Sequence, residues 1–150
     1  MTLINIDSGK KIKEANFKSE EELHRTVENN LPALLNMELI VHKYKTSQGG
    51  EMDSLALDKE TGAPVIIEYK VDKSRTILNQ LVYYYDWLFD HKDTFNRLVS
   101  EKLGSKVEVN WSENVRLVCI AQNYTDWDSA LVQHLDTEIE LYKYSYYIDN

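Results

Sequence analysis

Two charged side chains lie within a segment that otherwise has the composition of a buried strand. Residues 65–67 are β-branched and apolar, and Glu68 and Lys70 follow them in the same expected strand. Because residues two apart on a strand point to the same face, this carboxylate and this ammonium stand side by side. A buried charge is unfavourable unless it is paired or bound to a metal ion. The segment is therefore the first candidate for a site of chemistry.

The preceding strand adds a second carboxylate. If the hairpin turns between Glu60 and Thr61, the numbers of paired residues sum to 121. Asp53 then faces Glu68, with side chains ~5 Å apart across the strands. Two like charges at that separation repel each other unless a cation lies between them, and Mg²⁺ favours carboxylate oxygens. The spacing predicts a magnesium site.

Lys70 would stand beside this metal. It could orient or deprotonate a metal-bound water, or balance the charge of a phosphate, and the chemistry that fits best is phosphodiester hydrolysis. The structural alternative is an ion pair at the edge of a sheet, in which Lys70 neutralises Glu68.

These residues carry a resemblance to a known family. The segments 50–53 (Gly-Glu-Met-Asp) and 66–70 (Ile-Ile-Glu-Tyr-Lys) resemble motifs II and III of the PD-(D/E)XK nuclease superfamily, with Met52 where the name-giving proline would stand. Gln80 and Tyr84 are similar to the Q-x-x-x-Y element of its RecB-like branch. The resemblance covers the chain from about Glu20 to about Ile148. It is strongest to small prokaryotic proteins that are related to the C-terminal nuclease domain of archaeal-type mismatch endonucleases.

The resemblance implies a restriction-endonuclease-like α-β-β-β-α-β core and magnesium-dependent cleavage of DNA, with Mn²⁺ as a substitute metal. It implies that Asp53 and Glu68 are metal ligands and that Lys70 is the catalytic lysine. The first helix would add an acidic ligand, for which we prefer Glu20 over Glu28. Whether the enzyme would cut as an endonuclease or an exonuclease is left open.

Two further groups flank the expected site. Gln80 and Tyr84 share one face of a long helix, where Gln80 would assist catalysis and Tyr84 would contact nucleic acid; the alternative is that Tyr84 belongs to the core and Gln80 caps a strand end. Lys73 and Arg75 join Lys70 in a short basic cluster. Such a cluster is the best candidate for phosphate contacts, which supply most of the affinity for nucleic acid.

Local patterns predict the elements that position these residues. Ser19 and Thr125 are expected to cap helices over about 20–35 and about 126–135, with Pro32 ending or kinking the first. Longer apolar patterns predict helices over about 74–90, capped by Ser74, and 92–101. Alternating or β-branched runs predict strands over 37–44, 51–57, 65–71, 115–121 and 138–147, after an N-terminal hairpin extension over 1–18. This order predicts a single α/β domain with a mixed sheet flanked by helices.

Composition limits the partners. The 150 residues contain 25 Asp and Glu against 17 Lys and Arg, a net charge of −8. A field of that sign does not attract nucleic acid, so any contact must come from a local basic patch. The single cysteine and the lack of a signal peptide or a membrane-length apolar run predict a cytoplasmic protein with no membrane contact. A homodimer is compatible with the sequence. The competing function is a nuclease-fold binding or assembly module without catalysis.

Overall fold

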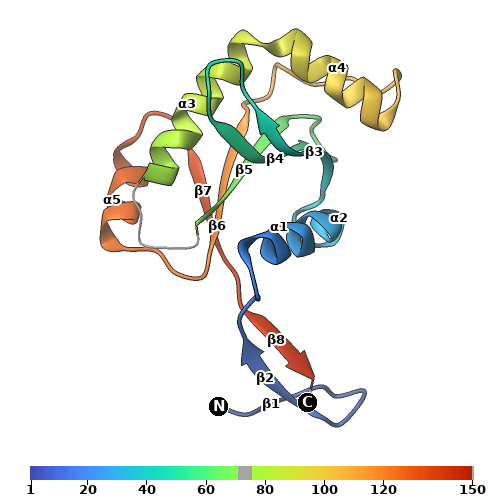
Figure 1. Ribbon diagram of the computed structural model, residues 1–150, viewed down its shortest axis with the longest axis vertical. Helices are drawn as coiled ribbons and strands as arrows, with labels where there is room; N and C mark the ends of the chain where they lie inside the picture. The colour runs from blue at the N-terminus through green and yellow to red at the C-terminus, as the bar shows by residue number, and fades with distance from the viewer. Residues whose placement is uncertain (71–75, 150) are drawn as a thin grey trace.

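The computed structural model describes residues 1–70 and 76–149, and a five-stranded sheet forms their centre (Figure 1). Its order is β3-β4-β5-β6-β7, with bounds Met37–Lys45, Glu51–Asp58, Pro64–Lys70, Arg116–Ala121 and Ile139–Lys143. The first three strands are antiparallel neighbours, and β6 and β7 continue the sheet in parallel. The predicted mixed sheet flanked by helices is confirmed.

Helices cover both faces of this sheet. The helices α1 (Glu20–Asn29) and α2 (Leu31–Leu35) pack on one face, and α3 (Thr76–Asp90) and α4 (Lys92–Leu103) pack on the other (Figure 1). The short α5 (Asp126–His134) follows β6. Strand alternation divides β5 between two cores, since Ile67 and Tyr69 pack with α1 whereas Ile66 packs with α3. Glu68 and Lys70 therefore point to the α3 face.

Helix boundaries follow the local signals. The Ser19 side chain accepts the N–H of Glu22, and Thr125 forms a reciprocal capping box with Asp128. Both predicted caps are confirmed. The helix expected over about 20–35 is divided, because α1 ends at Asn29 with Asn30 as its C-cap. Pro32 stands in the first turn of α2, where an N–H group has no hydrogen-bond partner within the helix, so proline costs nothing there. The proposed Ser74 cap lies outside the described residues. No helix within 1–70 and 76–149 is long and apolar enough to cross a membrane.

The β4–β5 hairpin has the predicted register. Its pairs, from Leu57 with Pro64 to Ser54 with Ile67, all sum to 121. The turn is fixed by the Asp58 carboxylate, which accepts the N–H groups of Glu60 (2.8 Å) and Thr61 (3.1 Å). This turn chemistry sets which side chains meet at the other end of the hairpin.

The C-terminal segment corrects one prediction. Residues 138–147 do not form a single strand that closes the main sheet, because β7 ends at Lys143 and β8 (Tyr146–Asp149) lies elsewhere. The neighbouring strand β6 ends at Ala121, whose carbonyl accepts the N–H of Tyr144, so the main sheet offers the chain no further partner. Instead, β8 pairs with β2 (Lys11–Ala15), which also pairs with β1 (Leu3–Ile4). The N-terminal hairpin is confirmed and gains a third strand.

We expect Thr125→Ala to lower the free energy of unfolding by about 1 kcal/mol, because an N–H at the start of α5 loses its acceptor. In a domain of this size the melting temperature should fall by about 2–4 °C. Thermal unfolding followed by circular dichroism measures the change. Ser129→Ala, an exposed change in the same helix, is the matched control. Equal melting temperatures for the two variants would show that the capping box contributes nothing.

Candidate metal and catalytic site

The site forms where β4 and β5 stop pairing. The last backbone pair of the hairpin joins Ser54 and Ile67. Beyond it, carboxylates replace the backbone acceptors: the N–H of Asp53 donates to Glu68 Oε1 (3.2 Å), and the N–H of Tyr69 donates to Asp53 Oδ2 (3.0 Å). The two carboxylates therefore face each other between the separating strands, as the turn arithmetic predicts.

Burial makes this pair electrostatically unfavourable without a cation. Glu68 is 2% exposed. Burial is the main cause of a strongly raised pKa for this carboxyl, and the neighbouring Asp53 carboxylate adds to it. The Glu20 carboxylate raises the pKa of Glu68 further. The protonated form of Glu68 is therefore favoured in the absence of metal, and a cation between the carboxylates would take the place of that proton.

Lys70 does not neutralise Glu68, which corrects the structural alternative. Its ammonium instead forms a buried ion pair with Asp128 from the first turn of α5. Burial acts to raise the pKa of Asp128, but hydrogen bonds from Lys70 and Thr125 outweigh it and hold the pKa below its usual range. Lys70 therefore has a fixed counter-ion and a fixed position. Among the contacts described for Lys70, none is a hydrogen bond to Asp53 or Glu68.

Asp128 is the residue that the sequence analysis missed. Its carboxylate also accepts the N–H of Thr125 (2.8 Å), so the same side chain closes the capping box and pairs with Lys70. The available signal was its position three residues after a capping threonine, directly behind a strand expected in the sheet centre. An acid there is usually only a cap.

The first helix offers two acids, and they have different surroundings. Glu28 is buried on the α1 face, where the Ser54 hydroxyl donates to it (2.7 Å) and His42 Nδ1 lies 2.9 Å away. Ser54 alternates with Asp53 along β4, so Glu28 faces away from the carboxylate pair. Glu28 is therefore a structural residue.

Glu20 is the acid of α1 whose charge raises the pKa of Glu68. Its side chain is 54% exposed and lies 3.5 Å from His24 Nε2. Among residues 1–70 and 76–149, no three His, Cys, Asp or Glu side chains are arranged to hold a metal ion. Glu20 thus does not complete a three-ligand cluster in this conformation, and its role as a ligand stays a prediction.

The α3 residues support the strand that carries Asp53. Tyr84 is 3% exposed and belongs to the core, which is the structural alternative for this residue. Its hydroxyl donates to the carbonyl of Glu51 (3.0 Å), two residues before Asp53. Gly50 allows this approach, since a Cβ there would lie 3.0 Å from the Tyr84 hydroxyl and its φ of +88° favours glycine. Tyr84 therefore has little surface to offer to nucleic acid.

Gln80 is exposed one turn before Tyr84. It lines a shallow pocket of about 340 Å³ together with the Gly49–Gly50 turn and Tyr83. The predicted phosphate contacts Lys73 and Arg75, like the Ser74 cap, lie outside the described residues.

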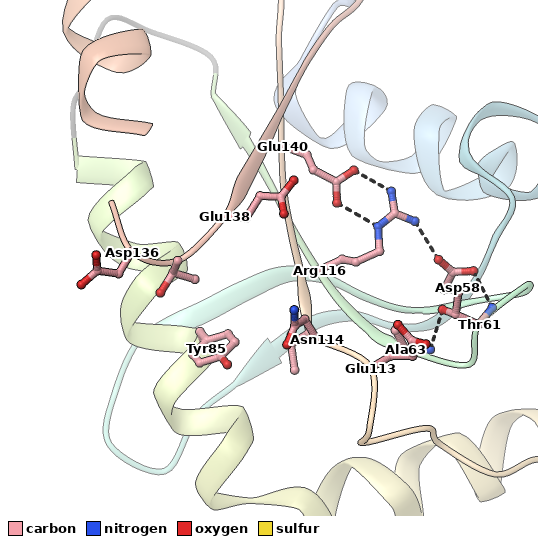
Figure 2. Close-up of a pocket in the computed structure, with 12 residues that line it drawn as sticks. Asp58, Thr61, Ala63, Tyr85, Glu113, Asn114, Arg116, Asp136, Glu138 and Glu140 are labelled. Atoms are coloured by element: carbon pink, nitrogen blue, oxygen red, sulfur yellow. Dashed lines mark hydrogen bonds and ion pairs between the residues drawn. The ribbon is translucent and has the colours of Figure 1, made fainter. Parts of the chain in front are cut away.

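A charged pocket lies at the end of the sheet opposite to the carboxylate pair, and Arg116 links the acidic residues in it (Figure 2). Arg116 donates two hydrogen bonds to Glu140 (2.8 and 2.6 Å) and one to Asp58 (2.9 Å). These bonds tie the β4–β5 turn to β6 and β7. Because two carboxylates already occupy its guanidinium, Arg116 serves the fold and has no free donor pair for a phosphate.

We expect Glu68→Gln to stabilise the metal-free protein. The folded pKa of Glu68 is raised, so the folded state keeps a proton that the unfolded chain releases, and stability falls as the pH rises above the ordinary carboxyl range. Glutamine cannot ionise and still donates to Asp53. In EDTA at pH 8 the melting temperature should rise by at least ~3 °C, the shift that about 1 kcal/mol produces.

The difference between Glu68→Gln and the wild type should shrink as the pH falls toward 4.5, where the unfolded carboxyl also holds its proton. Thermal unfolding of both proteins at pH 5, 6.5 and 8 tests this expectation. A variant that melts below the wild type at pH 8 in EDTA would contradict the argument that burial and Asp53 keep Glu68 protonated.

Comparison with known proteins places the fold. No family model matches the chain. An uncharacterized protein of Haemophilus influenzae is 27% identical over 135 residues, which are 88% of this chain and 44% of that protein. The chain is similar to a solved repair endonuclease from Pyrococcus abyssi, with 22% identity, a TM-score of 0.57, and coverage of 88% of this chain and 49% of that one.

Two EndoMS structures give the same result. The apo form matches with 20% identity, a TM-score of 0.55, and coverage of 87% of this chain and 48% of that chain. The complex with double-stranded DNA matches with 16% identity, a TM-score of 0.50, and coverage of 87% and 47%. The chain therefore spans about half, or slightly less, of the proteins it matches, and it shares the fold of one part of these repair endonucleases.

Proposed function

We propose that the protein is a metal-dependent nuclease that hydrolyses phosphodiester bonds in DNA. The observation that carries the proposal is the pair of the half-buried Asp53 and the buried Glu68 between two separating strands, with Lys70 on the same face of the sheet. A fold does not by itself imply a function. The carboxylate pair is evidence beyond the fold, because a divalent cation would remove the repulsion that otherwise favours the protonated form of Glu68.

The residues fit magnesium. Carboxylate oxygens from two strands are its preferred protein ligands, and Mg²⁺ keeps several of its waters when it is held by only one or two carboxylates. Asp53 and Glu68 would bind the ion directly, and Glu20 would bind it through a water, consistent with its exposed position. When bound, the ion would lower the pKa of a water and neutralise charge on the phosphate. Mn²⁺, which accepts the same ligands, should substitute.

Lys70 would stabilise the negative charge that develops on the phosphate. Its ion pair with Asp128 sets the direction of the ammonium group, which suits an electrostatic role. Gln80 would contact DNA beside the site from its exposed position on α3, and Lys73 and Arg75 are proposed to contact phosphates. Asp128 is a positioning residue that acts through Lys70.

DNA is the proposed substrate because the structures that share the fold are repair endonucleases, and one of them is a complex with double-stranded DNA. The net charge of −8 favours the competing proposal, a nuclease-fold module that binds or assembles without cutting. The cluster of charges favours catalysis, because a site without function has no need to keep Asp53, Glu68 and Lys70 together at the expense of stability.

We expect the wild type to cleave plasmid or single-stranded DNA in Mg²⁺ or Mn²⁺, and EDTA to abolish the cleavage. Asp53→Asn should lose at least ~10³-fold in rate, because the ion loses a charged ligand. Glu108→Gln, an exposed carboxylate away from the pair, is the control and should cut normally. Gel assays measure the rates. Normal cleavage by Asp53→Asn would refute the assignment, and metal binding without cleavage of DNA or RNA would favour the non-catalytic module.

Lys70→Gln should reduce cleavage by ~10²-fold or more while magnesium affinity stays unchanged, because the variant removes a charge that acts on the phosphate and leaves both metal ligands in place. Glutamine keeps a hydrogen-bond donor for Asp128, whereas Lys70→Ala would leave that buried carboxylate unpaired and cost about 3–5 kcal/mol of stability. Calorimetric magnesium titration and cleavage assays on Lys70→Gln test whether the cleavage rate falls while the magnesium affinity stays unchanged. A large loss of magnesium affinity, or a normal rate, would demote Lys70 to a structural partner.

A further inference from the structure

The three-stranded sheet of β1, β2 and β8 forms an arm that projects beyond the main sheet and its helices (Figure 1). We define the arm as residues 1–18 and 144–149. Its base is fixed to the body, because Phe17 and Tyr144 pack against the core on the α1 face of the main sheet. The third strand, β8, stabilises the β1–β2 hairpin, because an isolated two-stranded hairpin is marginally stable in water.

The arm differs in charge from the rest of the protein. It contains four lysines and three carboxylates, whereas the remaining residues contain 13 Lys and Arg and 22 Asp and Glu. The whole-chain charge of −8 therefore hides a local excess of positive charge. The arm is therefore more favourable to an anionic polymer than the acidic body as a whole.

The register divides the charges of the arm between its two faces. Lys13 pairs with Ile148 and Lys11 pairs with Ile4, so these four side chains share one face. Glu14 and Asp149 pair with residues of the other face. Lys11 and Lys13 are both exposed. One face of the arm consequently presents two lysines with no carboxylate among its paired residues, next to the exposed apolar side chains of Ile4 and Ile148.

The arm is continuous with the candidate catalytic site. Ala121, at the end of β6, pairs with Lys70 on one side, and its carbonyl accepts the N–H of Tyr144 at the start of the arm. The next residue, Gln122, donates to the side chain of Asn16 at the arm base (3.1 Å). A polar pocket of about 470 Å³ follows this junction, lined by residues of the arm and by Gln122 and Asn123. The base of the arm therefore lies next to the end of β6 that pairs with Lys70.

We propose that the lysine face of the arm, carried by Lys11 and Lys13, binds the phosphate backbone of the DNA that enters the site. This inference rests on the proposed function and names the surface that supplies affinity in an acidic protein. Lysines spaced two residues apart on a strand lie ~7 Å apart, close to the spacing of successive phosphates along one strand of DNA. We expect this contact to be independent of the base sequence, because phosphate contacts depend on charge alone.

The test compares Lys11→Gln/Lys13→Gln with Lys102→Gln/Lys106→Gln. These two exposed lysines lie in the last turn of α4 and just after it, and their replacement changes the net charge equally. Binding of a labelled duplex is measured in EDTA across a salt series. The arm variant should bind about tenfold more weakly at low salt, and the slope of log K against log salt should fall by about 2, as two lost phosphate contacts require. The α4 variant should match the wild type, and Lys11→Arg/Lys13→Arg should restore binding.

Cleavage assays separate this proposal from the nuclease proposal. The arm variant should raise KM and leave kcat unchanged at saturating DNA, because the arm touches no reacting atom. If the wild type cuts DNA and the two glutamine variants bind it equally, the arm proposal fails and the nuclease stands. If the wild type binds DNA without cutting it and the arm variant binds more weakly, the nuclease fails and the arm stands. A wild type that does not bind DNA overturns both.

An exposed sheet could instead bind a second copy of the chain. Light scattering of the same variants tests this alternative, because it measures the mass of the particle in solution. If the arm variant changes the oligomeric state while its DNA affinity per protomer equals that of the wild type, the arm is a contact between copies and the phosphate assignment is overturned. Unchanged mass with weakened DNA binding supports the proposal.

Discussion

The repulsion between a buried and a half-buried carboxylate is the constraint around which the domain is arranged. Asp53 and Glu68 lie together because the β4–β5 hairpin has a fixed register and because its strands separate one residue after their last backbone pair. The side chains then accept the N–H groups that the missing ladder would have satisfied. Their position is thus built into the backbone, and only the charge is left to be balanced from outside.

Much of this arrangement could be predicted from the sequence because it depends on local rules. A turn of fixed length sets the register, and strand alternation sets the face, so the meeting of Asp53 and Glu68 follows from counting. The helix caps at Ser19 and Thr125 are equally local. Such features need only a few neighbouring residues, and they are the ones that the structure confirms.

The parts that could not be predicted depend on long-range packing. The ion pair of Lys70 with Asp128 joins residues 58 positions apart, and nothing local distinguishes it from a pair with Glu68. The exit of β8 from the main sheet depends on where β6 ends, and its new partner β2 stands at the other end of the chain. The choice between Glu20 and Glu28 required the rotation of α1 against the sheet, which sets Glu28 against Ser54.

The two ends of the sheet balance charge in different ways. At one end, Arg116 is shared by Asp58 and Glu140, and hydrogen bonds occupy the cation from two sides (Figure 2). At the other end, three carboxylates, Asp53, Glu68 and Asp128, stand near one cation, Lys70, which Asp128 already engages. With all these groups ionised, the second cluster carries an excess of two negative charges in a buried setting. A single divalent cation would balance that excess, which links the choice of metal to the electrostatics of the fold.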